Sequence, residues 1–362
     1  MIRRANKPDK IILEEGNAMK KLVRSALAAA MLASTALVGS SASAQSMTAP
    51  PNPEANACQR ACLEGYVNKY LDAMAAHKVD PALFAAHVRF TENGVELPFG
   101  NEGLWATASG VGKYKFYVPD IETQQVAFIG TVLESASSSA SGPARAPDLV
   151  AIALRLRIVD GKITEVEQIA NRPDRPLGPP SANAAPANGL GAPGANIEAM
   201  GAPYASFLTA VPEKERRSRA DLIRVANYYF DAIQRNTGHG YYPFTDDCLR
   251  HENGTVTAGP ADAQNPNRKG CKAQLETSLI GAVTTIRDRR FVAVDRERGI
   301  VFAFGFFDHR SIDWTWELGE LFKINGEKIS RVEALILRGP YGMNSGWSTY
   351  EQTRSEQPQD IR

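Results

Sequence analysis

The chain has 362 residues, of which 43% are hydrophobic and 22% are charged, and these fractions exclude wholesale disorder and a fibrous repeat. Its 41 basic and 40 acidic residues leave a formal net charge of +1. The sequence holds no basic block that could neutralise a phosphate backbone, so nucleic acid is not an expected partner. The length corresponds to about two domains of ~100–200 residues.

The first 44 residues predict an upstream extension followed by a secretory signal peptide. From Met19, a basic stretch precedes an apolar stretch over residues 25–38 and a small-residue cleavage site that ends at Ala44. This order is typical of export signals, and the apolar stretch is short for a membrane span. We therefore expect translation to start at Met19, a signal peptide over residues 19–44, and a periplasmic or secreted mature protein without a membrane segment.

Four cysteines follow the predicted cleavage site, and an even count of four allows three pairings. An oxidising compartment makes disulfides the default. Proximity in sequence favours the pairs Cys58–Cys62 and Cys248–Cys271. A metal site is the alternative, but no two cysteines have two-residue spacing and no histidine stands at ligand spacing beside them. We expect no metal.

A stretch rich in Pro, Gly and Ala over residues 173–204 predicts a linker between two similar segments. The segments are copy one (residues 58–172) and copy two (residues 205–347), and a polar tail covers residues 348–362. Four matches occur in the same order: residues 66–74 match 225–233, residues 89–94 match 249–254, Asp120 and Gly130 match Asp295 and Gly305, and residues 160–167 match 326–333. We therefore predict two copies of one fold of roughly 120 residues.

Each copy is expected to open with an amphipathic helix, whose apolar stripe runs from Leu63 to Met74 or from Leu222 to Ile233. A turn follows, and then a strand that ends in Glu-Asn-Gly. A helical segment is expected around residues 271–286 of copy two. The remaining strands are predicted near residues 124–133, 149–159 and 162–171 of copy one and near 289–295, 299–309, 315–324 and 328–338 of copy two.

Several motifs carry a resemblance to a known fold: Cys58–Glu64, Phe90–Gly94 and Gly103–Trp105 in copy one, and Asp246–Cys248, Arg250–Gly254, Asp288–Phe291, Phe304–His309 and Pro340–Gly342 in copy two. A helix followed by a curved antiparallel sheet resembles the cone-shaped α+β fold of the NTF2-like superfamily, which includes SnoaL-like and ketosteroid isomerase-like proteins. The tandem arrangement resembles exported two-copy proteins of that superfamily, known from fungi and bacteria as a domain of unknown function. The resemblance implies two tandem cones, a small hydrophobic ligand, and copies paired within the chain or in a homodimer.

The two copies differ at two histidines. His251 stands where copy one has Thr91, and His309 stands where copy one has Glu134. Histidine is the side chain whose unperturbed pKa places its charge change in the neutral range, so copy two is expected to carry the chemistry. Strand alternation places His251 on the face of Leu249, and an inward Leu249 predicts an inward His251.

Related cone-fold enzymes use an inward His, Asp or Tyr as a general acid or base, and the resemblance therefore implies no cofactor. His251 is the predicted proton carrier, with Asp247 or Asp308 to orient it or relay the proton. His309 ends a strand and is a second candidate. Tyr229, on the apolar face of the first helix of copy two, is expected to steady developing negative charge.

Further residues of copy two are predicted to contact the substrate. Arg289 and Arg290 precede an apolar strand, and one of them is a candidate to bind a substrate carboxylate through two hydrogen bonds. Trp314 and Trp316 are expected to line an aromatic pocket or to pack between the copies. The remaining aromatic candidates are Phe304, Phe306 and Tyr341.

Together these features predict an exported, cofactor-independent lyase or isomerase that acts on a small apolar substrate, aromatic or polycyclic. The reaction would be a dehydration, a retro-aldol cleavage or a double-bond shift, each of which begins with a proton transfer. The alternatives are a module that binds a hydrophobic ligand without turnover and a structural pseudo-dimer. The unequal distribution of histidines favours the enzyme.

Overall fold

A computed structural model describes residues 57–135, 146–173, 191–235, 237–277 and 282–362. The predicted signal peptide, its cleavage site and residues 174–190 of the linker lie outside the described residues. All described helices and strands belong to one compact unit. Within the described ranges, no helix has the length and apolar character needed to cross a membrane.

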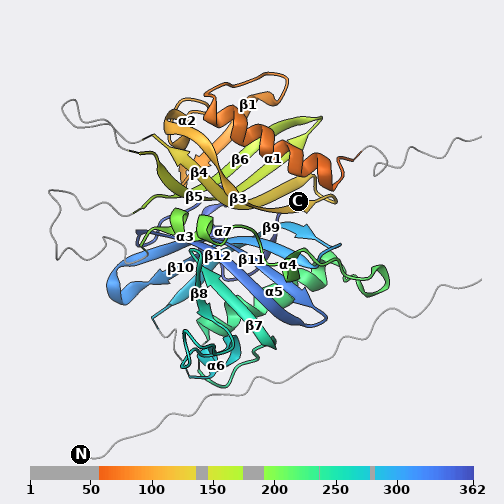
Figure 1. The fold of residues 1–362 in the computed structure, drawn as a ribbon, viewed down its shortest axis with the longest axis vertical. Coiled ribbons are helices and arrows are strands. Elements are labelled where there is room, and N and C mark those ends of the chain that lie inside the picture. Colours follow the sequence, from red (N-terminus) through yellow and green to blue (C-terminus); the bar gives the residue numbers. More distant parts are fainter. Residues whose placement is uncertain (1–56, 136–145, 174–190, 236, 278–281) are drawn as a thin grey trace, which may run out of the picture. The chain divides into compact units, whose positions relative to one another are not determined.

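The first half of the chain places helix α1 against a six-stranded sheet (Figure 1). Its elements are α1 (Arg60–Ala75), β1 (Phe84–Glu92), β2 (Val95–Glu96), α2 (Leu104–Thr107), β3 (Ala108–Asp120), β4 (Gln125–Glu134), β5 (Asp148–Val159) and β6 (Lys162–Asn171). The buried face of α1 includes Leu63, Val67, Tyr70 and Met74. This spacing of three to four residues is the predicted apolar stripe, and the helix is confirmed.

The second half repeats this plan with α5 against a seven-stranded sheet. Its elements are α3 (Pro193–Ala199), α4 (Ala205–Leu208), η2 (Glu213–Glu215), α5 (Arg219–Gln234), β7 (Phe244–Glu252), β8 (Thr255–Ala258), α6 (Cys271–Glu276), β9 (Thr285–Asp295), β10 (Ile300–His309), η3 (Arg310–Ile312), β11 (Trp314–Asn325), β12 (Lys328–Pro340), α7 (Tyr350–Thr353) and β13 (Gln359–Asp360). The strands predicted near residues 124–171 of copy one and near residues 289–338 of copy two are present, and their ends differ from the prediction by a few residues.

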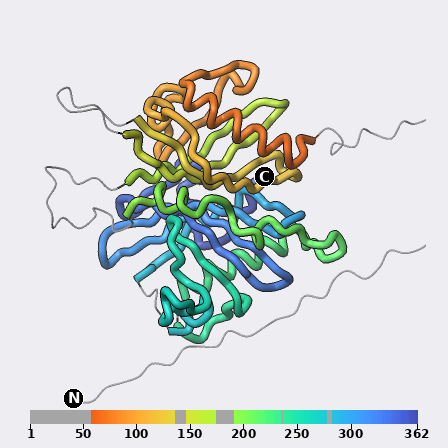
Figure 2. The backbone as a smooth tube through the Cα atoms, in the orientation of Figure 1, coloured from red at the N-terminus to blue at the C-terminus, as the bar shows by residue number. Residues whose placement is uncertain are grey.

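The two sheets have the same topology. Their strand orders are β2-β1-β6-β5-β4-β3 and β8-β7-β12-β11-β10-β9, and β13 extends the second sheet beyond β9. In both sheets the strand after the first helix pairs in parallel with the last strand of the hairpin series, β1 with β6 and β7 with β12. The chain is therefore an α+β protein with two tandem curved-sheet units. Figure 2 traces the bent strands of both sheets.

Each sheet uses its two faces differently. One face packs on the first helix of its own copy, α1 or α5, in a separate hydrophobic cluster. The opposite faces form a third cluster, which draws residues from both sheets and from α3 and α4. The sheets approach closely there, because a Cβ atom on Gly319 would lie 2.6 Å from the Cβ atom of Ala153. Glycine is required at this crossing.

Two ion pairs connect the copies in a reciprocal way. Arg60, at the start of α1, binds Asp295 of β9 at 2.8 Å. Arg219, at the start of α5, binds Asp120 of β3. Asp120 and Asp295 are matched positions in the duplicated sequence. Each copy therefore anchors the first helix of the other through the same kind of contact.

The structure differs from the sequence predictions in three segments. The expected helix around residues 271–286 ends at Glu276, and β9 begins at Thr285 because the β-branched run there favours a strand. Strand β3 was not predicted, although Tyr114, Phe116 and Val118 alternate with polar residues. The predicted linker ends earlier than expected, since residues 193–199 form α3.

The C-terminal residues 348–362 were predicted to be a polar tail, but they pack on the second sheet. They form α7 and the short strand β13, which pairs in parallel with β9. Polar residues hold this segment: Ser348 and Gln359 donate to the buried carboxylate of Asp288. The segment therefore belongs to the folded unit.

Both predicted disulfides are confirmed. Cys58 is bonded to Cys62 at the start of α1, and Cys248 of β7 is bonded to Cys271 at the start of α6. The described residues contain no free cysteine. The second disulfide closes a loop of 23 residues and holds α6 beside β7.

Candidate functional site

The space between α5 and the second sheet, here called the interior of copy two, holds a buried polar cluster. Tyr229 comes from α5, Arg250 from β7 and Glu320 from β11, and each is at most 4% exposed. Glu320 alternates along β11 with Leu318 and Phe322 on the face that packs against α5. Three chain segments therefore direct titratable groups into one apolar interior.

Arg250 is the centre of the hydrogen bonds in this cluster. Its Nε atom donates to Thr257 Oγ1 at 3.0 Å and lies 3.1 Å from a carboxylate oxygen of Glu252. Its Nη2 atom donates to the side chain of Gln274, on the helix that the Cys248–Cys271 disulfide ties to β7. Tyr229 lies close enough to Glu320 and Arg250 for its pKa to be affected by both: the charge of Glu320 raises it and the charge of Arg250 lowers it. These contacts fix the Arg250 guanidinium group in position beside the Glu320 carboxyl group.

Glu320 retains one unused hydrogen-bonding atom. Its Oε2 atom is buried and has no partner among the described residues. Burial, reinforced by the negative charge of Glu252, raises the pKa of Glu320 to about 8. Burial also raises the pKa of Tyr229. At neutral pH, Glu320 is therefore a neutral acid that can give a proton, and it ionises within reach of physiological pH.

Gly305 lies beside this cluster and has space for a Cβ atom. A Cβ atom placed on Gly305 would meet only two backbone oxygens within 4 Å among the described residues, at 3.8 and 4.0 Å. Gly305 pairs across the sheet with Leu318, so its missing side chain would point into the interior. At the matched Gly130 of copy one, the same atom would lie 2.2 Å from the ring of Phe128.

The matched positions of copy one explain this difference. Phe128, Leu154 and Phe90 fill its interior, where copy two has Ala303, Glu320 and Arg250 respectively. Copy one keeps the tyrosine, and Tyr70 is hydrogen-bonded to Gln168 and Trp105. At three matched positions, copy one therefore has apolar side chains, whereas copy two has one small side chain and an acid–base pair.

His251 differs from its predicted placement. Cys248 and Arg250 of β7 face the interior of copy two, so alternation turns His251 and Leu249 to the opposite face. The prediction took Leu249 as the inward residue, whereas the disulfide fixes Cys248 there. His251 Nε2 lies 3.2 Å from the Tyr204 hydroxyl, and burial together with nearby arginines lowers the pKa of His251 to about 4.

The two predicted aspartates do not lie in the interior either. Asp247 is exposed and pairs with Arg331 at 3.1 Å, and no contact joins it to His251 among the described residues. Asp308 is buried on the opposite face of β10, where it receives two hydrogen bonds from Arg287 and one from Thr315. Neither aspartate is placed to relay a proton from His251.

The predicted substrate arginines are occupied by other residues. Arg289 binds Asp231 at 2.7 Å and also contacts Asn227 and Gln234, so it holds α5 against β9. Arg290 binds Glu167 of copy one at 2.6 Å. Both guanidinium groups support the fold. The aromatic candidates Phe304 and Phe306 point to the face opposite the interior, Phe304 in the cluster between the sheets and Phe306 beside the Arg287 guanidinium.

His309 and the two tryptophans come together at one end of the interior. The ring centre of His309 lies 4.2 Å from that of Trp316 and 6.3 Å from that of Trp314. Trp316 packs against the hydrophobic cluster of copy two. Tyr341, the last candidate, is 40% exposed and lies with Arg310 at a small pocket of about 150 Å³ outside the interior.

Glu320 and Arg250 were not among the residues predicted from the sequence. Glu320 interrupts an alternation of apolar residues on the inward face of β11, and this interruption was the available signal. Arg250 follows the cysteine of the predicted disulfide by two residues, which places both on one face. In the described part of the chain, no group of three His, Cys, Asp or Glu residues is arranged to hold a metal ion.

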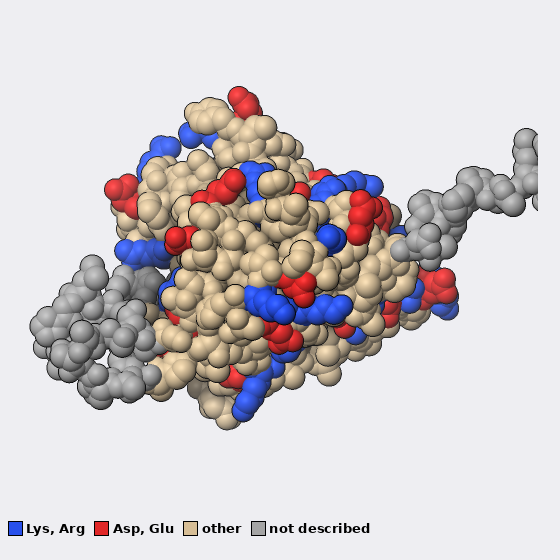
Figure 3. Space-filling model, turned by 90° about the horizontal axis from the view of Figure 1, so that it is seen from above, with Lys and Arg blue, Asp and Glu red and all other residues tan. Residues whose placement is uncertain are grey.

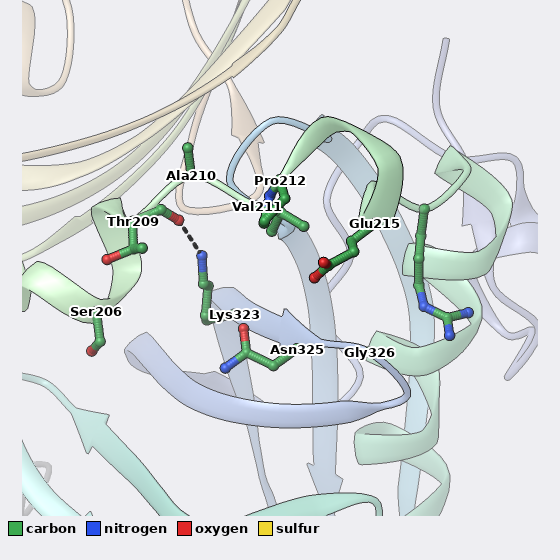
Figure 4. A pocket seen from close by; sticks show the side chains of 10 residues that line it. Ser206, Thr209, Ala210, Val211, Pro212, Glu215, Lys323, Asn325 and Gly326 are labelled. Carbon is green, nitrogen blue, oxygen red and sulfur yellow. Dashed lines mark hydrogen bonds between the residues drawn. The ribbon is translucent and has the colours of Figure 1, made fainter.

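A separate surface pocket of about 630 Å³ lies between residues 206–217 and the turn after β11 (Figure 4). Lys323 reaches it from below, but its ammonium group donates to the carbonyl oxygens of Thr209, Arg298 and Phe207. Burial lowers the pKa of Lys323 to about 8. Through these bonds Lys323 holds the segment before α5 in place.

On the face shown in Figure 3, basic and acidic side chains are interspersed.

Comparison with known proteins adds a family for the second half. Residues 215–336 match the family model of a domain of unknown function, DUF8021, so the C-terminal half carries a domain of this kind. No match was found among curated proteins. A designed protein with a curved β-sheet is similar over 33% of this chain and 88% of its own, at 15% identity and a TM-score of 0.24. A likeness at this level carries no functional information.

Three buried glutamates give a prediction for stability. Burial raises the pKa of Glu317 and Glu320 to about 8 and that of Glu333 to about 7. Above the pKa of the unfolded chain, the folded state holds more protons, so stability falls as pH rises through these values. The pKa values of His251 and His309 are lowered in the folded protein, so these two residues make stability rise with pH. They do so only below about pH 6.5, where the unfolded chain binds protons that the folded protein does not.

We therefore expect the free energy of unfolding to fall by roughly 2–4 kcal/mol between pH 6.5 and 8, at about 1.4 kcal/mol per proton and pH unit. Denaturant unfolding across this range measures the effect. The Glu333→Gln variant removes one of these groups and keeps a partner for the Tyr114 hydroxyl, which binds Glu333 at 2.7 Å. A wild-type stability that is flat across this range would contradict the prediction.

Proposed function

We propose that copy two is a cofactor-independent lyase or isomerase that moves a proton on a small, largely apolar substrate, aromatic or polycyclic, bound in its interior. We also propose that both copies are NTF2-like cones and that the mature protein is exported to the periplasm or secreted. Two disulfides and the repeated curved-sheet topology support these two proposals. The proton carrier in this proposal is Glu320 and not His251.

The observation that carries the proposal is the Glu320 carboxyl group, which is buried, has a free Oε2 atom and titrates at about pH 8. In a double-bond shift, the ionised Glu320 removes a proton from the carbon beside a substrate carbonyl. The C–H electron pair then moves toward the carbonyl oxygen, where Arg250 and Tyr229 can stabilise the negative charge. Glu320 returns the proton to another carbon, so atoms and charge balance.

The test is deuterium incorporation in heavy water, with a panel of small aromatic ketones, hydroxyketones and diaryl alcohols read by mass spectrometry. The wild type is expected to exchange or cleave at least one substrate. Gly305→Leu places a side chain in the interior beside Glu320 and is expected to abolish this reaction. Its Cβ atom meets no described side chain within 4 Å, and a denaturant unfolding curve of the variant separates a loss of stability from a blocked interior.

Gly65→Leu is the matched control, since a Cβ atom there also meets nothing within 4 Å and α1 lies outside copy two. It is expected to keep full activity. Exchange in the Gly305→Leu protein at the wild-type rate would place the reaction elsewhere. No exchange by the wild type across the panel would refute the enzyme.

The runner-up function is a module that binds a hydrophobic ligand without turnover. The same room above Gly305 and the apolar lining favour it. Thermal stabilisation by panel compounds, lost in Gly305→Leu and unaccompanied by exchange, would establish this function in place of the enzyme.

A further inference from the structure

One end of the interior, here called the mouth, is formed by His309 at the end of β10 and Trp314 at the start of β11. It holds two buried polar atoms without partners. These are His309 Nε2 and Trp314 Nε1, and neither has a hydrogen bond among the described residues. The residues face each other across the sheet, since His309 pairs with Trp314 in the β10–β11 ladder. A buried polar atom without a partner costs about 1–3 kcal/mol, so two of them on paired residues of neighbouring strands point to a ligand group.

The hydrogen-bonding roles of these atoms are opposite. His309 Nδ1 lies 3.0 Å from the Phe307 carbonyl oxygen, which can only accept. Nδ1 therefore carries the proton of the neutral ring, and burial lowers the pKa of His309. Nε2 is then an acceptor, whereas the indole Nε1 of Trp314 is a donor. One group that satisfies both is a hydroxyl, which donates to His309 and accepts from Trp314.

The inner end of the same interior offers a different pattern. Tyr229 and Arg250 are donors beside Glu320, whose Oε2 atom has no partner among the described residues. Such a set recognises a carbonyl oxygen. Between the two ends, Gly305 carries no side chain, and Phe307 and Leu318 are apolar.

The register of β11 measures the separation of the two ends. Trp314 and Glu320 are six residues apart on one strand and share one face, which corresponds to roughly 20 Å at about 3.3 Å per residue. Sheet curvature and two hydrogen bonds of about 2.8 Å shorten the span left for the ligand to roughly 10–14 Å between its polar atoms.

We infer that the ligand of copy two is an elongated aromatic or polycyclic ketone with a hydroxyl at the end opposite its carbonyl. The hydroxyl binds His309 and Trp314 at the mouth, and the carbonyl binds the Glu320 cluster at the inner end. This inference rests on the proposed function for its site, but it concerns recognition and not turnover.

The test compares three probes by calorimetry and by tryptophan fluorescence. 4-Acetyl-4′-hydroxybiphenyl has both oxygen functions, 4-acetylbiphenyl lacks the hydroxyl, and 4-hydroxyacetophenone is short. The wild type is expected to bind the first probe about tenfold more tightly than the second, since one net hydrogen bond is worth about 1.4 kcal/mol or less. The short probe is expected to bind more weakly than both.

The variant His309→Phe keeps an aromatic ring against Trp316 and removes the acceptor. It is expected to bind the first two probes equally, and Trp314→Phe should narrow the difference in the same way. Equal binding of both biphenyls by the wild type, or no binding of the hydroxylated biphenyl at millimolar concentration, would overturn the inference. If the wild type prefers the hydroxylated biphenyl but shows no deuterium exchange, the inference about the ligand stands and the enzyme is refuted. If it shows deuterium exchange but binds both biphenyls equally, the enzyme stands and the inference about the ligand is refuted.

Discussion

The Glu320→Gln protein is expected to lose proton transfer by about 10²–10⁴-fold, the usual worth of a positioned general acid or base. The amide cannot give or take the proton, but it fills the same space and can still bond to Tyr229. The readout is the rate of deuterium incorporation at a fixed substrate concentration, together with the substrate affinity. Affinity is expected to change much less than rate.

Glu317 supplies a matched control for this substitution. It lies on the same strand, is almost fully buried, and burial raises its pKa to about 8 as well. Its side chain, however, points to the opposite face, toward Glu167 and Arg290. Glu317→Gln is therefore expected to react at the wild-type rate. If both variants lost activity equally, the effect would come from the fold and not from Glu320.

The pH profile of the wild type offers a second check on the same residue. If Glu320 acts first as the base, the rate at saturating substrate rises with pH, is half-maximal near pH 8 and levels off above about pH 9, because the ionised fraction rises through a pKa of about 8. The Glu320→Gln protein should lose this rise. A wild-type profile governed by a group near pH 4, where His251 titrates, would return that role to His251.

Removal of residues 343–362 is expected to destabilise the protein by more than about 4 kcal/mol, because two buried charges lose several of their partners at once. Asp288 is fully buried and accepts hydrogen bonds from Ser345, Ser348 and Gln359. Arg287 loses a bond to the Met343 carbonyl oxygen in the same deletion. The measurement is denaturant unfolding of the truncated chain beside the full-length protein.

Two point variants keep this prediction testable if the truncated chain does not fold. Ser345→Ala with Ser348→Ala removes two donors to Asp288 and is expected to cost roughly 3–6 kcal/mol, at about 1.5–3 kcal/mol for each bond to a charged group. Tyr350→Ala, in the same segment, changes a side chain that is 70% exposed and should cost less than about 0.5 kcal/mol. A cost below 0.5 kcal/mol for the serine pair would show that the segment does not anchor the charge.

Much of the fold could be predicted because its signals are local or repeated. The apolar stripes of α1 and α5, the strands from β4 to β6 and from β9 to β12, and both disulfides follow from spacing along the chain. The duplication follows from four ordered matches, and the identical strand orders confirm it. Strand β3 escaped because glycines at 110 and 112 dilute its pattern.

The site was harder to predict for a geometric reason. The period of a strand is two, so one wrong choice of the inward residue on β7 moved His251 into the interior and Arg250 out of it. Tyr229, alone among the five predicted catalytic residues, lies at the polar cluster, and His309 lies at the mouth. Arg289 and Arg290 look free in the sequence, but their carboxylate partners come from distant segments.

The amino-acid sequence by itself determined two copies of a helix-and-sheet unit and the chemical inequality of the copies, and it favoured one of the three possible pairings of the cysteines. These properties depend on residue order and periodicity, which are complete in the chain. Only the tertiary structure decided that Tyr229, Arg250 and Glu320 meet, since they are contributed by α5, β7 and β11. It also decided that Gly305 faces room while Gly130 faces a ring, because a void depends on side chains from neighbouring strands and not on the glycine itself.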